Sequence, residues 1–215
     1  MIHNFSDKSS VLSVFIAEIR DERIQKDALR FRTNLERIAL ILGYELSKKL
    51  KYESCEVITP LGTANCQSLS HQPVIASILR AGVPMHNGLQ KIFDRSENAF
   101  VSAYRKPHKN GDFDVFVEYM SAPNLESKTL IIADPMLATG ASLNKVYKAL
   151  LKNGVPTKIH VVAAIASQEA IDFLKRKLPK TTEFWLGAID EELTAQSYIV
   201  PGLGDAGDLA YGPKS

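Results

Sequence analysis

The sequence predicts an α/β protein whose mostly parallel sheet is flanked by helices, and two observations support this prediction. From Pro73 onward, short apolar runs alternate with segments of helical period, as in parallel strands joined by crossover helices. Before that point, a segment alternates around Pro60-Leu61-Gly62, which predicts a β-hairpin arm. No internal repeat or linker interrupts the chain, so residues 1–215 are expected to form a single domain.

Two N-terminal helices precede the hairpin. The first is expected at residues 10–20, and the second from Thr33, which has capping-box spacing to Glu36. An apolar stripe at helical period follows in the second helix, formed by Leu35, Ile38, Ala39, Leu42, Leu46 and Leu50. The hairpin itself is expected within residues 55–70.

The rest of the chain supplies the sheet and its crossover helices. Strands are expected near residues 74–79, 99–104, 129–133, 159–166 and 183–188. Helices are expected near residues 84–93, 142–152 and 168–177. The last helix has Ser167 before it and Pro179 after it, which are start and stop signals. Because such sheets bind ligands beyond the carboxyl ends of their strands, the site is expected there.

Composition excludes several classes of function. A chain of 215 residues with 45% hydrophobic content can bury a full core. A net charge of +2 lacks the strong basic stripe of a nucleic-acid-binding domain. There is no basic region followed by an apolar core, as in a secretory signal, and no apolar run near the ~20 residues of a membrane span. We therefore expect a cytoplasmic protein that binds neither membrane nor nucleic acid.

Three further patterns bear on catalysis. Cys55 and Cys66, the two cysteines, lack Cys-x-x-Cys spacing, which favours free thiols over a metal site. Asp190-Glu191-Glu192 resembles a paired-acid site but is interpreted as a solvated turn. The chain has no Gly-x4-Gly-Lys-Ser/Thr loop, which argues against a P-loop kinase.

Residues 130–142, Leu-Ile-Ile-Ala-Asp-Pro-Met-Leu-Ala-Thr-Gly-Ala-Ser, are the most informative about function. Four apolar residues predict a buried strand that ends at Asp134, and a helix pattern begins after Ser142. Such a turn directs backbone N–H groups and a helix N-terminus at an anion. Thr139 and Ser142 add hydroxyl donors, and the small residues between them allow close approach. The alternative is an ordinary strand-to-helix turn capped by a serine.

The run Asp-Pro-Met-Leu-Ala-Thr-Gly resembles the phosphoribosyl-pyrophosphate (PRPP) motif of type I phosphoribosyltransferases. Most members of that fold have two adjacent acids there, whereas Pro135 in the second position matches the uracil phosphoribosyltransferases. Two more segments match this family: Ile78-Leu79-Arg80-Ala81-Gly82, and the run from Tyr198 to Asp208. The three motifs stand in the family's order and spacing from about residue 70 to the end of the chain.

The resemblance implies how PRPP would be held. It assigns the ribose hydroxyls to Asp134, the 5′-phosphate to the turn 138–142, and pyrophosphate to Arg80, whose guanidinium matches paired phosphate oxygens. For Arg80 the alternative is a structural ion pair. The expected PRPP-binding residues are Arg80, Arg105, Asp134, Pro135, Met136, Leu137, Ala138, Thr139, Gly140, Ala141, Ser142 and Asp205.

A basic loop at residues 105–112 links two strand-like runs. By resemblance, Arg105 contacts PRPP as a catalytic residue, and the loop folds over the site. Lys106 and Lys109 either attract the same anion or form a solvated hairpin tip. Family members often carry acids just after this arginine, so contacts beyond Arg105 are not carried over.

The C-terminal motif is expected to form a base-binding loop. Uracil presents an acceptor, a donor and an acceptor along one edge, and backbone groups can recognise this order. The resemblance implies the uracil-binding residues Ile199, Gly204, Asp205 and Ala206. It also makes Asp205 the second catalytic residue, near a Mg²⁺ ion that is held mainly by PRPP and water, with no metal site made by the protein alone. The alternative, a flexible tail, fits poorly with the apolar residues of this run.

The expected function is therefore uracil phosphoribosyltransferase activity: a pentosyl transfer from PRPP to uracil that yields UMP and pyrophosphate in pyrimidine salvage. Two alternatives remain open, an RNA-binding regulator on the same fold and a transferase for another base. A net charge of +2 does not supply the basic face that the first needs, and base-dependent pyrophosphate release decides the second. The resemblance further implies a homodimer or a higher homo-oligomer.

Overall fold

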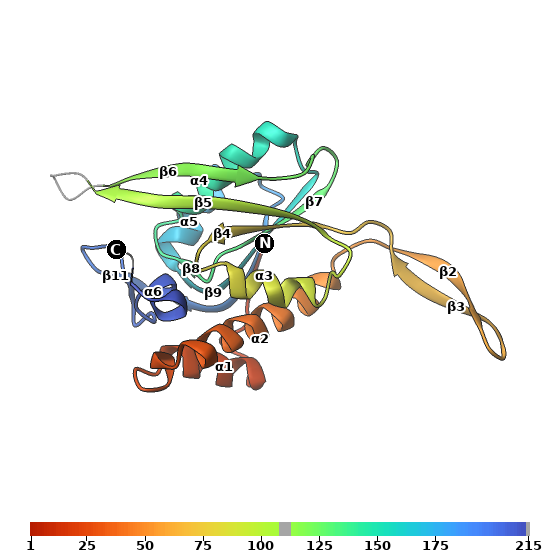
Figure 1. The fold of residues 1–215 in the computed structure, drawn as a ribbon, viewed down its shortest axis with the longest axis horizontal. Coiled ribbons are helices and arrows are strands. Elements are labelled where there is room, and N and C mark those ends of the chain that lie inside the picture. Colours follow the sequence, from red (N-terminus) through yellow and green to blue (C-terminus); the bar gives the residue numbers. More distant parts are fainter. Residues whose placement is uncertain (108–112, 214–215) are drawn as a thin grey trace.

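The computed structural model describes residues 1–107 and 113–213, and the side chains of these residues except at 104–107 and 113–115. The main sheet has the strand order β1-β10-β9-β7-β4-β5-β6, with the short β8 paired to β9 (Figure 1). These strands are β1 Ile2–Asn4, β4 Val74–Leu79, β5 Glu97–Pro107, β6 Phe113–Ser121, β7 Thr129–Ala133, β8 Met136–Leu137, β9 Lys158–Ser167 and β10 Glu183–Asp190. All neighbours are parallel except β5 and β6. The predicted mostly parallel sheet is confirmed.

Helices cover both faces of the sheet, and each face has its own hydrophobic core. One core contains α1 Val11–Arg20, α2 Ala28–Ser47 and α3 Val83–Gln90; the other contains α4 Ala141–Leu150 and α5 Gln168–Lys177. The buried apolar residues of β9 are divided between them, with Val162 in the first core and Val161 in the second. A strand buried on both faces explains why the β9 segment is continuously apolar.

The first predicted helix is confirmed, because Ser10 caps α1. The predicted start of the second helix is wrong: α2 begins at Ala28, where the Asp27 carboxylate accepts the N–H of Arg30 at 3.0 Å. Thr33 therefore lies inside the helix, and the capping box with Glu36 does not form. The apolar stripe from Leu35 to Leu46 is fully buried as predicted, while Leu50 lies beyond the helix end.

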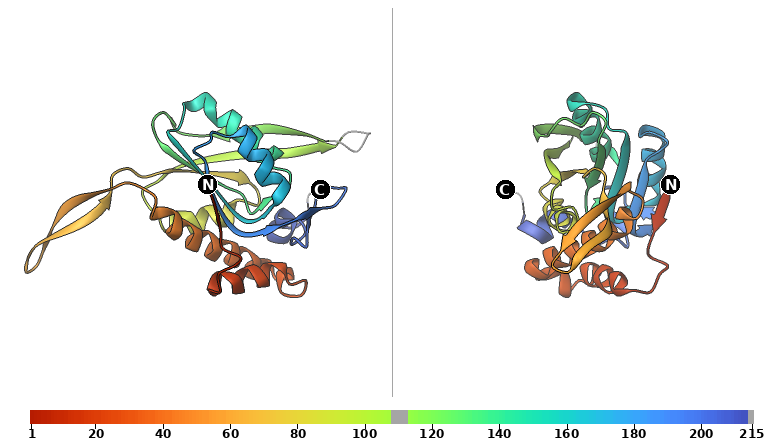
Figure 2. Two further views of the ribbon diagram at one scale, coloured as in Figure 1. Left: turned by 180° about the vertical axis from the view of Figure 1, so that it is seen from behind. Right: turned by 90° about the vertical axis from the view of Figure 1, so that its right-hand side faces the viewer.

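The predicted hairpin forms an arm that projects from the body of the protein (Figures 1 and 2). It consists of β2 Tyr52–Thr59 and β3 Gly62–Leu69, so it begins three residues before the predicted range. Cys55 pairs in register with Cys66, and both are free thiols, as predicted. Leu61 at the tip is fully exposed.

Several short elements were not predicted from the sequence. They are β1, β8, the 3-10 turns Ile24–Lys26 and Leu151–Asn153, β11 Glu192–Leu193, β12 Ile199–Val200 and α6 Ala206–Tyr211. The solvated-turn interpretation of residues 190–192 is wrong for Asp190, which is buried at the end of β10 and paired with Arg20. Glu191 and Glu192 are exposed. No helix in the described ranges is long and apolar enough to cross a membrane.

Candidate active site

A cavity of about 490 Å³ lies beyond the carboxyl ends of the adjacent parallel strands β4 and β7. The end of β4, the turn after β7 and the loop before α6 all line it. This volume is within the range of small-molecule sites. The three motifs, which are far apart in the sequence, therefore meet at one place, and it is the edge of the sheet where a ligand was expected.

The turn after β7 is held by β9. The Asp134 N–H donates to the carbonyl of Val162 at 3.1 Å, and β8 pairs with the next residues of β9. The Asp134 carboxylate in turn accepts the N–H of Met136 at 3.3 Å. These bonds place the acid and the residues after it at the cavity wall.

The helix after this turn begins one residue earlier than predicted, at Ala141. Its N-cap is Gly140, in the left-handed region at φ 75°, where a Cβ atom would lie 2.8 Å from Leu174. A glycine therefore suits this position both by conformation and by space. Ser142 is in the first helical turn and still lines the cavity, whereas Ala141 does not line it. The Thr139 hydroxyl accepts the N–H of Ala141 at 3.3 Å.

Arg80 follows β4, the strand beside β7, and also lines the cavity. Its Nη2 donates to the carbonyl of Gly212 at 3.1 Å and to the carboxylate of Asp208 at 3.4 Å. Its Nε is buried and has no acceptor among the described residues. The ion pair that was the alternative role thus exists, and donor capacity for an anion remains beside it. Gly82 permits the turn, because a Cβ there would lie 2.6 Å from the carbonyl of Ile78.

The C-terminal loop forms the third wall. Ile199 is buried, pairs with Leu193 across β11 and β12, and does not line the cavity, whereas Gly204, Asp205 and Ala206 do. The Asp205 carboxylate caps α6 by accepting the N–H groups of residues 207 and 208 at 2.8 and 3.0 Å. The flexible-tail alternative is wrong, because the loop residues Leu203 and Ala206 are also buried in the core.

Residues 196–198 also line the cavity and were not among the predicted site residues. They form the tip of the β11–β12 hairpin, which closes with the Thr194 N–H donating to the carbonyl of Tyr198 at 2.8 Å. Ser197 has φ 62°. The apolar run at Tyr198 was the available signal, but the hairpin partner, only two residues long, was too short to recognise.

A buried Ser–His pair lies outside the lining of the site. His86 Nδ1 lies 2.7 Å from the hydroxyl of Ser77, and both residues are at most 2% exposed. Burial lowers the pKa of His86. Neither side chain lines the cavity, so the pair has no access to a ligand there, and the contact satisfies the Ser77 hydroxyl and His86 Nδ1 within the core.

The family model described as uracil phosphoribosyltransferase matches residues 6–213. The chain belongs to the uracil phosphoribosyltransferase family. A relative of that name from Porphyromonas gingivalis is 51% identical over 95% of each chain. Another from Pyrococcus furiosus is 36% identical and covers 98% of this chain and 90% of its own. The solved structure of a protein from Aquifex aeolicus matches 99% of this chain and 98% of its own, with a TM-score of 0.87 and 30% identity.

Membership of the uracil phosphoribosyltransferase family confirms the type I phosphoribosyltransferase-like fold class. The predictions for Arg105 and Lys106 concern side chains that lie outside the described part of the structure, and residues 108–112 lie outside it altogether. The backbone of Arg105 is on β5, paired with Val115 of β6. The roles assigned to Arg105, Lys106 and Lys109 stay predictions.

No group of three or more His, Cys, Asp and Glu side chains in the described ranges is arranged to hold a metal ion. Two carboxylates, those of Asp134 and Asp205, nevertheless line the cavity. Carboxylate oxygens suit Mg²⁺, which keeps several waters and binds substrate phosphates. The donor set therefore fits an ion that a phosphorylated ligand brings with it.

Proposed function

We propose that this chain is a uracil phosphoribosyltransferase, which transfers the phosphoribosyl group of PRPP to uracil and yields UMP and pyrophosphate. The observation that carries the proposal is the convergence of the three family motifs on one cavity. Relatives named for this activity match 95% or more of the chain. The reaction is a pentosyl transfer and belongs to pyrimidine salvage.

Within this proposal, PRPP spans the cavity between two anion sites. The turn at residues 138–142 and the N-terminus of α4 hold the 5′-phosphate, since both direct N–H groups outward. Asp134, on the same turn, accepts hydrogen bonds from the ribose hydroxyls. Arg80, at the end of the adjacent strand β4, holds pyrophosphate through its guanidinium, whose Nε has no acceptor among the described residues. Arg105 and the remaining residues of the PRPP-binding set complete the site.

The base lies against the loop before α6. The Ala206 N–H is the first of α6, for which the helix supplies no acceptor. From the family resemblance we assign the recognition of uracil to the backbone of Ile199, Gly204 and Ala206, with Asp205 beside it; of these residues, Gly204, Asp205 and Ala206 line the cavity and Ile199 does not. Because main-chain groups cannot exchange donor and acceptor roles, they suit the fixed edge of uracil.

The chain promotes the reaction by placing uracil N1 in line with C1 of the ribose as pyrophosphate departs. Positive character develops at the ribose ring, and the carboxylates of Asp134 and Asp205 lie on the cavity wall. Positioning and electrostatics of this kind contribute on the order of 3–10 kcal/mol each. Bound with PRPP, Mg²⁺ would neutralise pyrophosphate charge and improve the leaving group, with Asp205 and water as its contacts to the protein.

The remaining parts of the proposal rest on the composition of the chain and, for the oligomeric state, on the family resemblance. The chain works as a single phosphoribosyltransferase domain over residues 1–215, in the cytoplasm, as a homodimer or a higher homo-oligomer. The projecting arm lies at the opposite end of the molecule from α6, so contacts made by the arm leave its own cavity open (Figure 1).

The test is pyrophosphate release from PRPP with uracil, cytosine, hypoxanthine or adenine, with and without Mg²⁺. Uracil alone should support rapid release, and omission of Mg²⁺ should abolish it. Release with another base in place of uracil would establish the alternative transferase. No release with any base would refute the proposal.

A further inference from the structure

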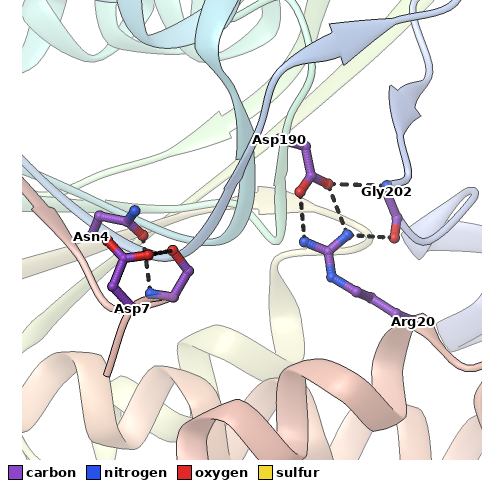
Figure 3. Close-up of polar contacts among 6 residues, drawn as sticks. Asn4, Asp7, Arg20, Asp190 and Gly202 are labelled. Atoms are coloured by element: carbon purple, nitrogen blue, oxygen red, sulfur yellow. Dashed lines mark hydrogen bonds and ion pairs between the residues drawn. The ribbon is translucent and has the colours of Figure 1, made fainter. Parts of the chain in front are cut away.

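The segment that carries the base-binding loop is joined to the rest of the protein at Gly202. This residue is buried, between the end of β12 and the start of α6. Both of its backbone polar groups are hydrogen-bonded to side chains of other elements. Its N–H donates to the Asp190 carboxylate at 3.0 Å, and its carbonyl accepts from Arg20 Nη1 at 2.9 Å (Figure 3).

Arg20 and Asp190 also bind each other. The two guanidinium nitrogens lie 2.8 and 2.7 Å from the two carboxylate oxygens, in a bidentate pair. The Asp190 side chain is only 6% exposed and that of Arg20 is 22% exposed. Figure 3 shows the three residues closing a ring of hydrogen bonds. A bidentate pair of this kind fixes the relative orientation of the guanidinium and the carboxylate as well as the distance between them.

The elements that supply the two side chains are themselves fixed. Arg20 is the last residue of α1, whose buried residues pack in the core, and Asp190 is the last residue of β10, which pairs with β9 over its length. Gly202 has φ 56°, and a Cβ atom would lie 2.1 Å from the carbonyl of Ile199. The loop thus turns sharply where it is held, two residues before it reaches the cavity at Gly204.

We propose that Arg20 is a positioning residue for the base: through Asp190 and Gly202 it sets the loop whose residues 204–206 line the cavity. Arg20 and Asp190 do not line the cavity themselves, so they act only through Gly202. The kinetic part of this inference rests on the proposed function. The geometric part does not, because it concerns the order of the loop in the ligand-free protein.

The experiment compares Arg20→Ala, Arg20→Lys and a matched control, Arg30→Ala. Arg30 also makes a bidentate pair, with Glu18, at 3.0 and 2.6 Å, and links α2 to α1 without contacting the C-terminal loop. Two readouts are used, amide exchange of peptides covering residues 199–207 and KM for each substrate. In Arg20→Ala, exchange in these peptides should be about tenfold faster, or more, while peptides of β9 are unchanged.

Under the same conditions, KM for uracil should rise about tenfold or more. A more mobile loop must become ordered when the base binds, and the conformational entropy lost then reduces the binding free energy. KM for PRPP should change by less than about threefold, since most of the residues proposed to bind it are on the β4 and β7 turns. Arg20→Lys keeps the charge but cannot satisfy both oxygens of Asp190 and the Gly202 carbonyl, so it should fall between wild type and Arg20→Ala. Arg30→Ala should behave as wild type.

Unchanged exchange and unchanged KM for uracil in Arg20→Ala would overturn the inference. If Arg20→Ala fails to fold, Arg20→Lys decides it by the same two readouts. Faster exchange throughout the chain in Arg20→Lys, with both KM values raised equally, would also overturn it, because that result marks a purely structural role. If the wild type releases no pyrophosphate with any base, the proposed function fails, and the exchange comparison still decides the role of Arg20.

Discussion

The hydroxyl of Ser167 donates to the carbonyl of Ala138 at 2.5 Å and accepts the N–H of Ala170 at 2.9 Å. Ser167 is fully buried and caps α5, and Ala138 belongs to the turn that we propose binds the 5′-phosphate. One side chain thus ends a strand, begins a helix and holds the wall of the cavity. Its loss should affect both stability and the binding of PRPP.

Ser167→Ala removes a helix cap and leaves a carbonyl without its donor. We expect the free energy of unfolding to fall by about 2–4 kcal/mol, measured by urea denaturation, and KM for PRPP to rise several-fold. Ser10→Ala is the matched control, because Ser10 caps α1 away from the cavity; it should cost about 1 kcal/mol and leave KM unchanged. Equal stability losses in the two variants, with KM for PRPP unchanged in both, would contradict this prediction.

Asp134→Asn should weaken transition-state binding if the carboxylate holds the ribose hydroxyls. Loss of a charge-assisted hydrogen bond costs about 1–3 kcal/mol, which corresponds to roughly 5–150-fold in kcat/KM for PRPP. The same assay on Asp172→Asn, which changes a half-exposed acid on α5, should show no loss. An Asp134→Asn protein that folds and keeps its kcat/KM would exclude this role for Asp134.

The base preference follows from recognition by the backbone of Ile199, Gly204 and Ala206. Cytosine has a lone pair at N3 and an amino group at C4, so two of the three positions have the wrong polarity. Two unpaired groups should cost about 3–6 kcal/mol, or roughly 10²–10⁴ in kcat/KM relative to uracil. Purines should show no detectable reaction.

Substituents at C5 of uracil test shape separately, because they leave its hydrogen-bonding edge intact. 5-Fluorouracil should be accepted, and any rejection of thymine must be steric. Initial rates of pyrophosphate release with each base give these ratios. Comparable turnover of uracil and cytosine would rule out recognition by the backbone.

Stability should depend on pH through His160, which is fully buried and accepts a hydrogen bond from Trp185 Nε1 at 3.1 Å. Burial lowers the pKa of His160 to about 4, below the ~6.5 of an unfolded chain. Between these pH values the unfolded state binds the proton and the folded state does not. The contribution of His160 to stability is therefore complete above pH ~6.5 and falls by about 3 kcal/mol as the pH drops to about 4.

Urea denaturation at several pH values measures this dependence. His160→Gln keeps an acceptor but does not titrate, so its free energy of unfolding should fall less steeply over the same pH range. His71→Gln, which changes an exposed histidine, should retain the wild-type slope. Identical slopes in the wild type and His160→Gln would show that another group controls the acid sensitivity.

Much of the fold could be predicted because its signals are local. The strand at 129–133 is a run of apolar residues buried on both faces, and the helix at 168–177 has a capping serine before it and a proline after it. The motifs around Arg80 and Asp134 were recognised from the sequence alone. In the structure they lie at strand ends, where ligands bind in parallel sheets. Apolar periodicity, helix caps and strand ends depend mainly on neighbouring residues, so the sequence reveals many of them, although the cap of α2 is Asp27 and not Thr33.

Contacts between distant residues were decided by tertiary structure. β1 is three residues long and is a strand because β10 offers it a parallel edge. In the sequence, Asp190 looks like one acid of a polar turn, yet it is buried in the structure. Its charge is neutralised by Arg20, 170 residues earlier, and its carboxylate also accepts the N–H of Gly202. A buried charge is tolerated only where a partner and hydrogen bonds are in place. The packing of α1 against the sheet brings Arg20 to Asp190, and no local pattern in the sequence predicts that packing.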